Sequence, residues 1–144
     1  MEMVEVKTSE LIGAALDWAV AVVEGWEPVR GSTLRKVSVV LGIEIECLAF
    51  AGKHIEGAMP EPRSYYPSTD WSQGGPLIEK YDVWLSPITD CEPSGWDADV
   101  YELDGSEGTG VRTIQGCATP LIAACRAIVA AKLGDTVLVP AELL

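Results

Sequence analysis

Histidine is almost absent from this sequence of 144 residues, which contains only His54. Its four cysteines, Cys47, Cys91, Cys117 and Cys125, form no CxxC pair and are too sparse for a disulfide framework. Four-coordinate zinc sites need paired ligands at short spacing, and a histidine-activated nucleophile needs a histidine beside it. We therefore predict no metal site, and we expect His54 to lie in a surface turn.

Recognisable catalytic motifs are also missing. There is no GxSxG turn, and GSEGTG at residues 105–110 has neither the Gly-Lys-Ser/Thr of a phosphate loop nor the glycine spacing of a dinucleotide turn. A pair of carboxylates carries little information in a chain with 22 acidic residues. We predict no catalytic residue and no cofactor. Whether the protein is an enzyme stays open, and a non-enzymatic role is favoured.

Positive charge is scarce, because 10 lysines and arginines stand against 22 acidic residues and leave a net charge of −12. Binding to a phosphate backbone or to an anionic membrane depends on clustered positive charge. The longest apolar stretch, residues 37–51, is interrupted by Gly42, Glu44 and Glu46 and is too short for a membrane span. The N-terminus lacks the pattern of a secretory signal. The sequence thus predicts a cytoplasmic protein that binds neither nucleic acid nor membrane directly.

Apolar residues are plentiful, at 48% of the chain, and the length suits one core. A first helix is predicted over residues 10–24, with Thr8 or Ser9 as its cap and Gly25 after its end. Its acidic residues recur every seven positions and form one narrow stripe: Glu10, Asp17 and Glu24. A second long helix is predicted to follow the cap Thr119, with Pro120 in first position and Gly134 as its stop.

Extended structure is predicted at residues 34–51, as a hairpin or bent strand pair interrupted at Gly42. Further extended segments are predicted over residues 83–85, 96–103 and 137–140, and Ser86-Pro87 is expected to end the first of them. The predicted fold is α+β, with two apolar helices packed on a small, mainly antiparallel β-sheet. We expect a single compact domain over residues 1–144.

Three blocks of the sequence resemble the NinX-like family of small phage and prophage proteins: VKTSELIGAALDWAVAVVEG (residues 6–25), YPSTDWSQGGPLIE (66–79) and TPLIAACRAIVAAKLGDTVLVP (119–140). They occur in the order in which the family has them. The segments at about residues 26–64 and 86–112 are long by comparison and inherit nothing from the resemblance. The resemblance implies a phage accessory protein of unknown function in the cytoplasm of an infected bacterium, and it implies no reaction.

The central block begins in a segment dense in polar and turn-forming residues, residues 65–75. Gly75-Pro76 is expected to start a short helical turn. On a structural interpretation the segment is a loop that folds over the helices, held by Trp71 and Asp70. On a functional interpretation it is a binding surface, whose candidate residues are Tyr65, Tyr66, Ser68, Thr69, Asp70, Trp71, Gln73, Gly74 and Gly75.

The predicted helix start at Thr119 has no acidic residue in its first turn, so its N–H groups and dipole can attract an anion. Thr119 is therefore a further candidate binding residue. A neighbouring carboxylate such as Asp70, or water, is the simpler partner for these N–H groups.

Residues 81–111 hold eight acidic residues and no lysine or arginine: Asp82, Asp90, Glu92, Asp97, Asp99, Glu102, Asp104 and Glu107. A solvated surface is one interpretation, and an acidic face that meets a basic partner is the other. A calcium-binding EF-hand loop is excluded because Glu102 stands where that loop requires glycine.

We favour a non-enzymatic module with an acidic surface that binds a host or phage protein, with residues 65–75 and the acidic residues 82–107 as the contact surface. A basic partner would suit that surface. The first alternative is a small-molecule or anion-binding protein, which could be an enzyme, with its site at residues 68–75. The second is a structural module in which the apolar helices meet in a homo-oligomer.

Overall fold

The computed structural model describes residues 2–52, 63–89, 95–103 and 109–144. Its elements, in chain order, are β1 (Met3–Lys7), a 3-10 turn η1 (Thr8–Glu10), α1 (Gly13–Val23), β2 (Glu27–Arg30), β3 (Thr33–Val40), β4 (Ile43–Ala51), β5 (Arg63–Tyr65), α2 (Trp71–Lys80), β6 (Val83–Ile88), β7 (Gly95–Leu103), β8 (Thr109–Cys117), α3 (Pro120–Leu133), β9 (Thr136–Pro140) and a 3-10 turn η2 (Ala141–Leu143). The predictions for His54, Cys91 and four of the acidic residues (Asp90, Glu92, Asp104 and Glu107) fall outside the described residues.

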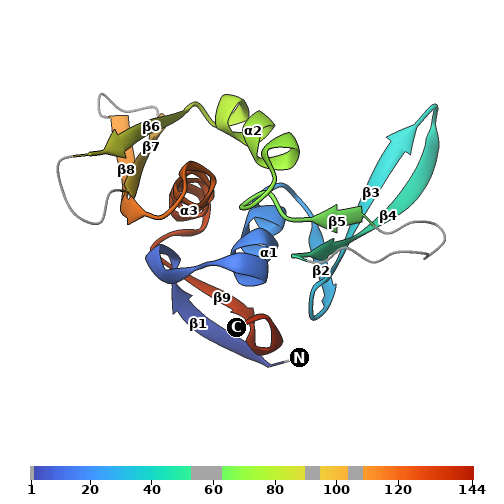
Figure 1. The fold of residues 1–144 in the computed structure, drawn as a ribbon. Coiled ribbons are helices and arrows are strands. Elements are labelled where there is room, and N and C mark those ends of the chain that lie inside the picture. The colour runs from blue at the N-terminus through green and yellow to red at the C-terminus, as the bar shows by residue number, and fades with distance from the viewer. Residues whose placement is uncertain (1, 53–62, 90–94, 104–108) are drawn as a thin grey trace.

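Helix α3 lies at the centre of the molecule, between α1 and the strands β6 to β8 (Figure 1). The Thr119 hydroxyl accepts a hydrogen bond from the Ile122 N–H at 3.1 Å, and Pro120 is the first helical residue. Gly134 ends the helix with a φ of +96°, in the region that favours glycine. The predicted cap, start and stop of this helix are therefore confirmed. Most of its side chains are buried, including Ala124, Ile128 and Val129.

Helix α1 packs on α3, but it begins later than predicted. Thr8 does not cap it, because the Thr8 hydroxyl donates to the Gly134 carbonyl at 2.7 Å and its N–H donates to the Asp135 carbonyl at 2.8 Å. The chain makes the 3-10 turn and then enters the helix at Gly13, which has a φ of +61°. The predicted start at residue 10 was wrong, whereas the end just before Gly25 is close to the observed one.

Strands β1 and β9 pair antiparallel, with Met3 opposite Pro140 and Lys7 opposite Thr136. This pairing brings the two ends of the chain side by side (Figure 1). The extended segment at residues 137–140 was predicted, whereas β1 was not. The valines of β9 that face inward are buried because α1 and α3 cover this ribbon: Val137 and Val139.

Strands β6, β7 and β8 form an antiparallel sheet on the far side of α3 (Figure 1). The strand β6 runs on to Ile88 and includes Pro87, so the prediction that Ser86-Pro87 ends it was wrong. Among the described strands β6 pairs only with β7, and a proline without an N–H is tolerated on such an edge strand. The strand at residues 96–103 is confirmed as β7, and β8 was not predicted.

Strands β2 to β5 form the third sheet, in which β4 and β5 are parallel and the other pairs antiparallel. The predicted hairpin is confirmed as β3–β4. Its turn consists of Leu41 and Gly42, with φ values of +53° and +78°. Leu34 and Ala49 at the base of the hairpin are buried, and its outer half projects away from the helices (Figure 1).

The fold class predicted from the sequence is confirmed. The chain forms a compact α+β structure, although its described strands divide among three sheets instead of one. One cluster of buried apolar side chains extends from Leu11 to Val139 and includes α1, α3 and the inner faces of the sheets. In the described part of the chain, no helix is both long and apolar enough to cross a membrane.

Candidate functional site

Residues 66–70 form a tight turn, and the helix α2 follows immediately. The N–H groups of Thr69 and Asp70 both donate to the Tyr66 carbonyl at 3.1 Å, which closes the turn. The Asp70 carboxylate then accepts from the Ser72 N–H at 3.0 Å and caps α2. Helix α2 therefore starts at Trp71, and the predicted start at Gly75-Pro76 was wrong because Asp70 supplies an N-cap earlier in the chain.

Three further polar side chains, those of Thr69, Ser72 and Gln73, bond within this segment. The Gln73 side-chain oxygen accepts from the Tyr66 N–H at 2.7 Å, and the Thr69 hydroxyl approaches the Tyr66 carbonyl at 3.4 Å. The Ser72 hydroxyl donates to the Asp70 carboxylate at 2.8 Å. The candidate residues of this segment thus lie together, and hydrogen bonds inside the chain occupy much of their polar capacity.

Trp71 does not hold the segment down, because 56% of its surface is exposed. The expectation that it fixes the segment was wrong, and two other residues have that role. Pro67 is fully buried. Gly74 lets α2 approach so closely that a Cβ there would lie 2.3 Å from the Pro67 carbonyl oxygen and 2.7 Å from a methyl carbon of Leu121 in α3. Gly74 is therefore a packing residue.

The structure also brings to this turn a residue that the sequence analysis did not select, Asp17 of α1. Its side chain is 1% exposed, and its Oδ1 accepts a hydrogen bond from the buried Ser68 N–H at 2.9 Å. The predicted acidic stripe is thus interrupted, because Glu10 is exposed outside the helix and Asp17 points into the protein. An acidic residue in the middle of an otherwise apolar helix was the signal that could have found it.

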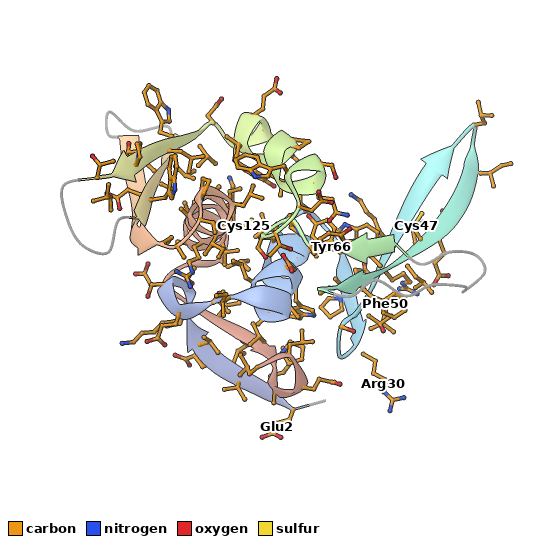
Figure 2. The ribbon with its side chains drawn as sticks, in the orientation of Figure 1. Glu2, Arg30, Cys47, Phe50, Tyr66 and Cys125 are labelled. Carbon is orange, nitrogen blue, oxygen red and sulfur yellow. The ribbon has the colours of Figure 1, made fainter. Side chains whose placement is uncertain are left out.

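A cavity of about 320 Å³ opens between α1, the end of β4 and the 66–70 turn. Its lining residues are Gly13, Ala14, Asp17, Gly52, Tyr66 and Thr69. Gly13 and Asp17 lie one helical turn apart, so both face this space. Gly52 has a φ of +67°, and a Cβ there would lie 2.6 Å from the Ala14 Cβ. Tyr66 lies near the middle of the molecule, beside α1 (Figure 2). We call this space the Asp17 cavity.

Burial controls the electrostatics around Asp17. Desolvation raises the pKa of Asp17 from 3.8 to about 6, and the hydrogen bonds from Ser68 oppose this rise. Burial also raises the pKa values of Tyr65 in β5 and Cys125 in α3, and the nearby Asp17 charge adds to both shifts. Tyr65 and Cys125 therefore stay neutral at neutral pH. Of these three groups, Asp17 is the one whose pKa lies close to neutral pH.

Thr119 is not among the residues that line the Asp17 cavity. Its hydroxyl caps its own helix, and Asp70 caps α2. The predicted partnership between Asp70 and the start of α3 is replaced by these two local caps. Of the acidic segment, the structure describes the side chains of three residues: Asp82, Asp97 and Asp99. In the described ranges no three histidine, cysteine or acidic side chains gather as a metal site would require.

The β3–β4 hairpin exposes apolar side chains at several positions. Leu41 in its turn is 97% exposed, Val39 is 68% exposed and Ile43 is 65% exposed. Val37 and Val39 stand opposite Glu46 and Glu44, so two valines and two carboxylates share one face. Ile43 pairs with Val40 and therefore lies on the opposite face. We call the exposed residues of both faces and the turn the hairpin surface: Val37, Val39, Leu41, Ile43, Glu44 and Glu46. No candidate from the sequence lies on it, because its alternating pattern was used only to predict strands.

The fold and these sites define a class: a small α+β protein with a helical core and an exposed apolar hairpin. The chain belongs to the family described as Bacteriophage P22, NinX, whose sequence model matches residues 7–132. It is thus a phage accessory protein of the NinX family, as the resemblance implied. No match to the chain was found among curated proteins.

Proposed function

We propose that this phage accessory protein acts as a non-enzymatic binding module and that the hairpin surface contacts a host or phage protein. The single observation that carries the proposal is the exposed leucine in the hairpin turn. Leu41 has a φ of +53°, where leucine is strained and asparagine or glycine is usual. It is also almost completely exposed. Neither the backbone nor the solvent favours leucine here, whereas a contact with a partner does.

Charge indicates the chemistry of the partner. Glu44 and Glu46 stand beside the exposed Val39 and Val37, and the whole chain carries a net charge of −12. A complementary surface presents apolar side chains flanked by lysine or arginine. The acidic segment at residues 82–107 would add to the attraction of such a basic partner at longer range. Residues 65–75 have less support as the contact surface, because most of their polar groups already bond within the chain.

The two alternatives have less support than the hairpin surface. An anion site at residues 68–75 is disfavoured because the adjacent cavity contains the Asp17 carboxylate. Homo-oligomerisation through the apolar helices is disfavoured because α1 and α3 cover each other and the sheets cover α3 inside one chain.

The test is capture of proteins from phage-infected host cells with the wild-type protein and matched variants as bait. A Val39→Ser, Leu41→Ser double variant removes much of the apolar hairpin surface. Leu138→Ser removes another exposed leucine, from β9, and Trp71→Ala removes the exposed tryptophan of α2. We expect a basic protein to be retained by the wild type and by both single variants and lost from the double variant. If the double variant still retains the basic protein, or if Trp71→Ala is the only variant that loses it, the hairpin surface is not the contact.

A further inference from the structure

The Asp17 carboxylate is buried. Its Oδ1 has one hydrogen bond, from the Ser68 N–H, and no lysine, arginine or histidine pairs with it in the part of the chain that the structure describes. Removing a carboxylate from water is costly unless a positive charge or several hydrogen bonds compensate it. The buried Ser68 side chain lies next to this carboxylate and favours its ionised form, but it brings no positive charge. Within the described residues, the negative charge of this buried carboxylate therefore has no positive partner.

The shape of the surroundings suits a small ligand. The cavity of about 320 Å³ lies at the lower end of the volumes usual for small-molecule sites. Two of its lining residues are glycines, so backbone forms part of its wall, and Thr69 at its rim is exposed. Tyr66 supplies an aromatic side chain to the same lining, and aromatic rings attract organic cations.

We propose that the Asp17 cavity binds a small organic cation, an alkylammonium or guanidinium group, with the Asp17 carboxylate as its counter-ion. The cation neutralises the buried charge and donates hydrogen bonds to the carboxylate. A metal ion fits less well, because the lining residues that the structure describes include one carboxylate and no histidine or cysteine. The cation can belong to a free amine or to a lysine or arginine side chain of another protein. The proposal does not depend on the hairpin surface, so either can fail without the other.

The first measurement is an NMR titration of the wild-type protein with agmatine, which carries both an ammonium and a guanidinium group. A capped tripeptide with one central lysine is titrated in parallel. Saturable shifts of the Ser68 amide are expected, with a dissociation constant of about 0.1–10 mM for a ligand of this size. Binding of agmatine alone assigns the site to free amines, and binding of the peptide assigns it to protein side chains. If neither produces a saturable shift beyond that of sodium chloride at equal ionic strength, the proposal is wrong.

Two variants test the role of the Asp17 charge and the location of the bound cation. Asp17→Asn keeps an oxygen acceptor for the Ser68 N–H but removes the negative charge, and it should weaken binding of the active probe at least about tenfold. Thr69→Lys places a cation at the rim of the cavity and should compete with the probe. Unchanged affinity in a folded Asp17→Asn protein would overturn the proposal. If that variant does not fold, the pKa of Asp17 is measured in the wild type from the pH dependence of its carboxyl carbon signal, with and without the probe. A bound cation must lower this pKa, and an unchanged pKa would overturn the proposal.

Binding should also weaken as the pH falls from 7 to 5, because protonated Asp17 no longer attracts a cation. Among the described residues, Tyr65 of β5 and Cys125 of α3 interact electrostatically with Asp17, and both remain neutral over this range. The pH profile therefore reports on Asp17, and an affinity that is constant between pH 7 and pH 5 would contradict its role as counter-ion.

Discussion

At the residue scale, Asp17 shows how one buried charge links helix packing to pH. The side chain lies on the helix face that packs inward, and the Ser68 N–H of the 66–70 turn reaches its carboxylate. The same contact therefore fixes the turn against α1 and leaves a charge under the surface. This arrangement is stabilising when Asp17 is neutral, and it costs desolvation energy when Asp17 is ionised.

The pH dependence of stability tests this description of Asp17. The unfolded chain holds the Asp17 proton only below about pH 3.8, whereas the folded chain holds it up to about pH 6. Between these values the folded state binds more protons, so the free energy of unfolding should rise as the pH falls through this window. The contribution of this group is at most about 3 kcal/mol.

The comparison with Asp17→Asn isolates that contribution from the other acidic residues of the chain. Urea unfolding at several pH values should give a difference between wild type and variant that changes between pH 6 and pH 4 and is constant above pH 7. Parallel profiles for the two proteins over the whole range would show that Asp17 is not a buried carboxyl with a raised pKa.

Two neighbouring glycines of α2 give a second prediction at this scale. Gly74→Ala places a Cβ against the Pro67 carbonyl and Leu121, so it should lower the free energy of unfolding by about 1–3 kcal/mol. At Gly75 the nearest atom, a ring carbon of Trp71, lies 4.0 Å from the Cβ position. Gly75→Ala should therefore stabilise the protein by about 0.5–1 kcal/mol, because alanine has the better helix propensity. Denaturant unfolding measures both values, and equal effects of the two substitutions would contradict the packing described for Gly74.

At the element scale, the β3–β4 hairpin is built differently from the helices. Helices α1 and α3 are held by burial on several sides, whereas the outer half of the hairpin depends on its strand pairs and its turn. In that turn Leu41 adopts a left-handed conformation that costs about 1–2 kcal/mol for an ordinary residue. An element whose own turn is strained is expected to open locally more easily than the core.

Substitutions at Leu41 can separate strain from contact. Leu41→Asn relieves the strain, so it should protect the amides of residues 37–46 against hydrogen exchange by up to about 1 kcal/mol. Leu41→Gln keeps the strain and should leave this protection unchanged. Both remove the apolar side chain, so both should weaken partner binding. If Leu41→Asn leaves hydrogen exchange unaltered, the turn is not strained as described.

Sequence patterns predicted the elements whose signals are local. The cap Thr119, the first-turn Pro120 and the stop Gly134 define α3 by themselves, and the alternation around Gly42 defines the hairpin. The start of α1 was missed because Thr8 bonds to Gly134 and Asp135, far away in the sequence. Strand β1 was missed for the same kind of reason, because only its pairing with β9 distinguishes it from a loose terminus.

The candidate site was predicted only in part. The segment around Asp70 was recognised from its turn chemistry, and Tyr66 and Thr69 do line the observed cavity. Asp17 and Gly52 could not be associated with it, because residues so distant in sequence meet only through tertiary packing. Trp71 was expected to be an internal anchor because of its size, whereas the cap at Asp70 directs it to solvent.

At the scale of the whole molecule, the three sequence blocks that carry the family resemblance meet in the interior. They supply α1, the 66–70 turn with α2, and α3 with β9, and these elements enclose Asp17 and most of the core. The hairpin surface comes from the intervening segment and lies outside this centre (Figure 1). The interior thus contains most of the core and the Asp17 cavity, and we propose the projecting hairpin as the partner contact.

Photo-crosslinking in phage-infected cells tests that assignment most directly. A photoreactive benzoylphenylalanine replaces Leu41 in one protein and Leu138, which is also exposed, in a matched control. We predict a crosslinked adduct with a basic host or phage protein from position 41 and none from position 138. Adducts from position 138 alone, or an adduct from position 41 that contains only a second copy of this chain, would contradict it.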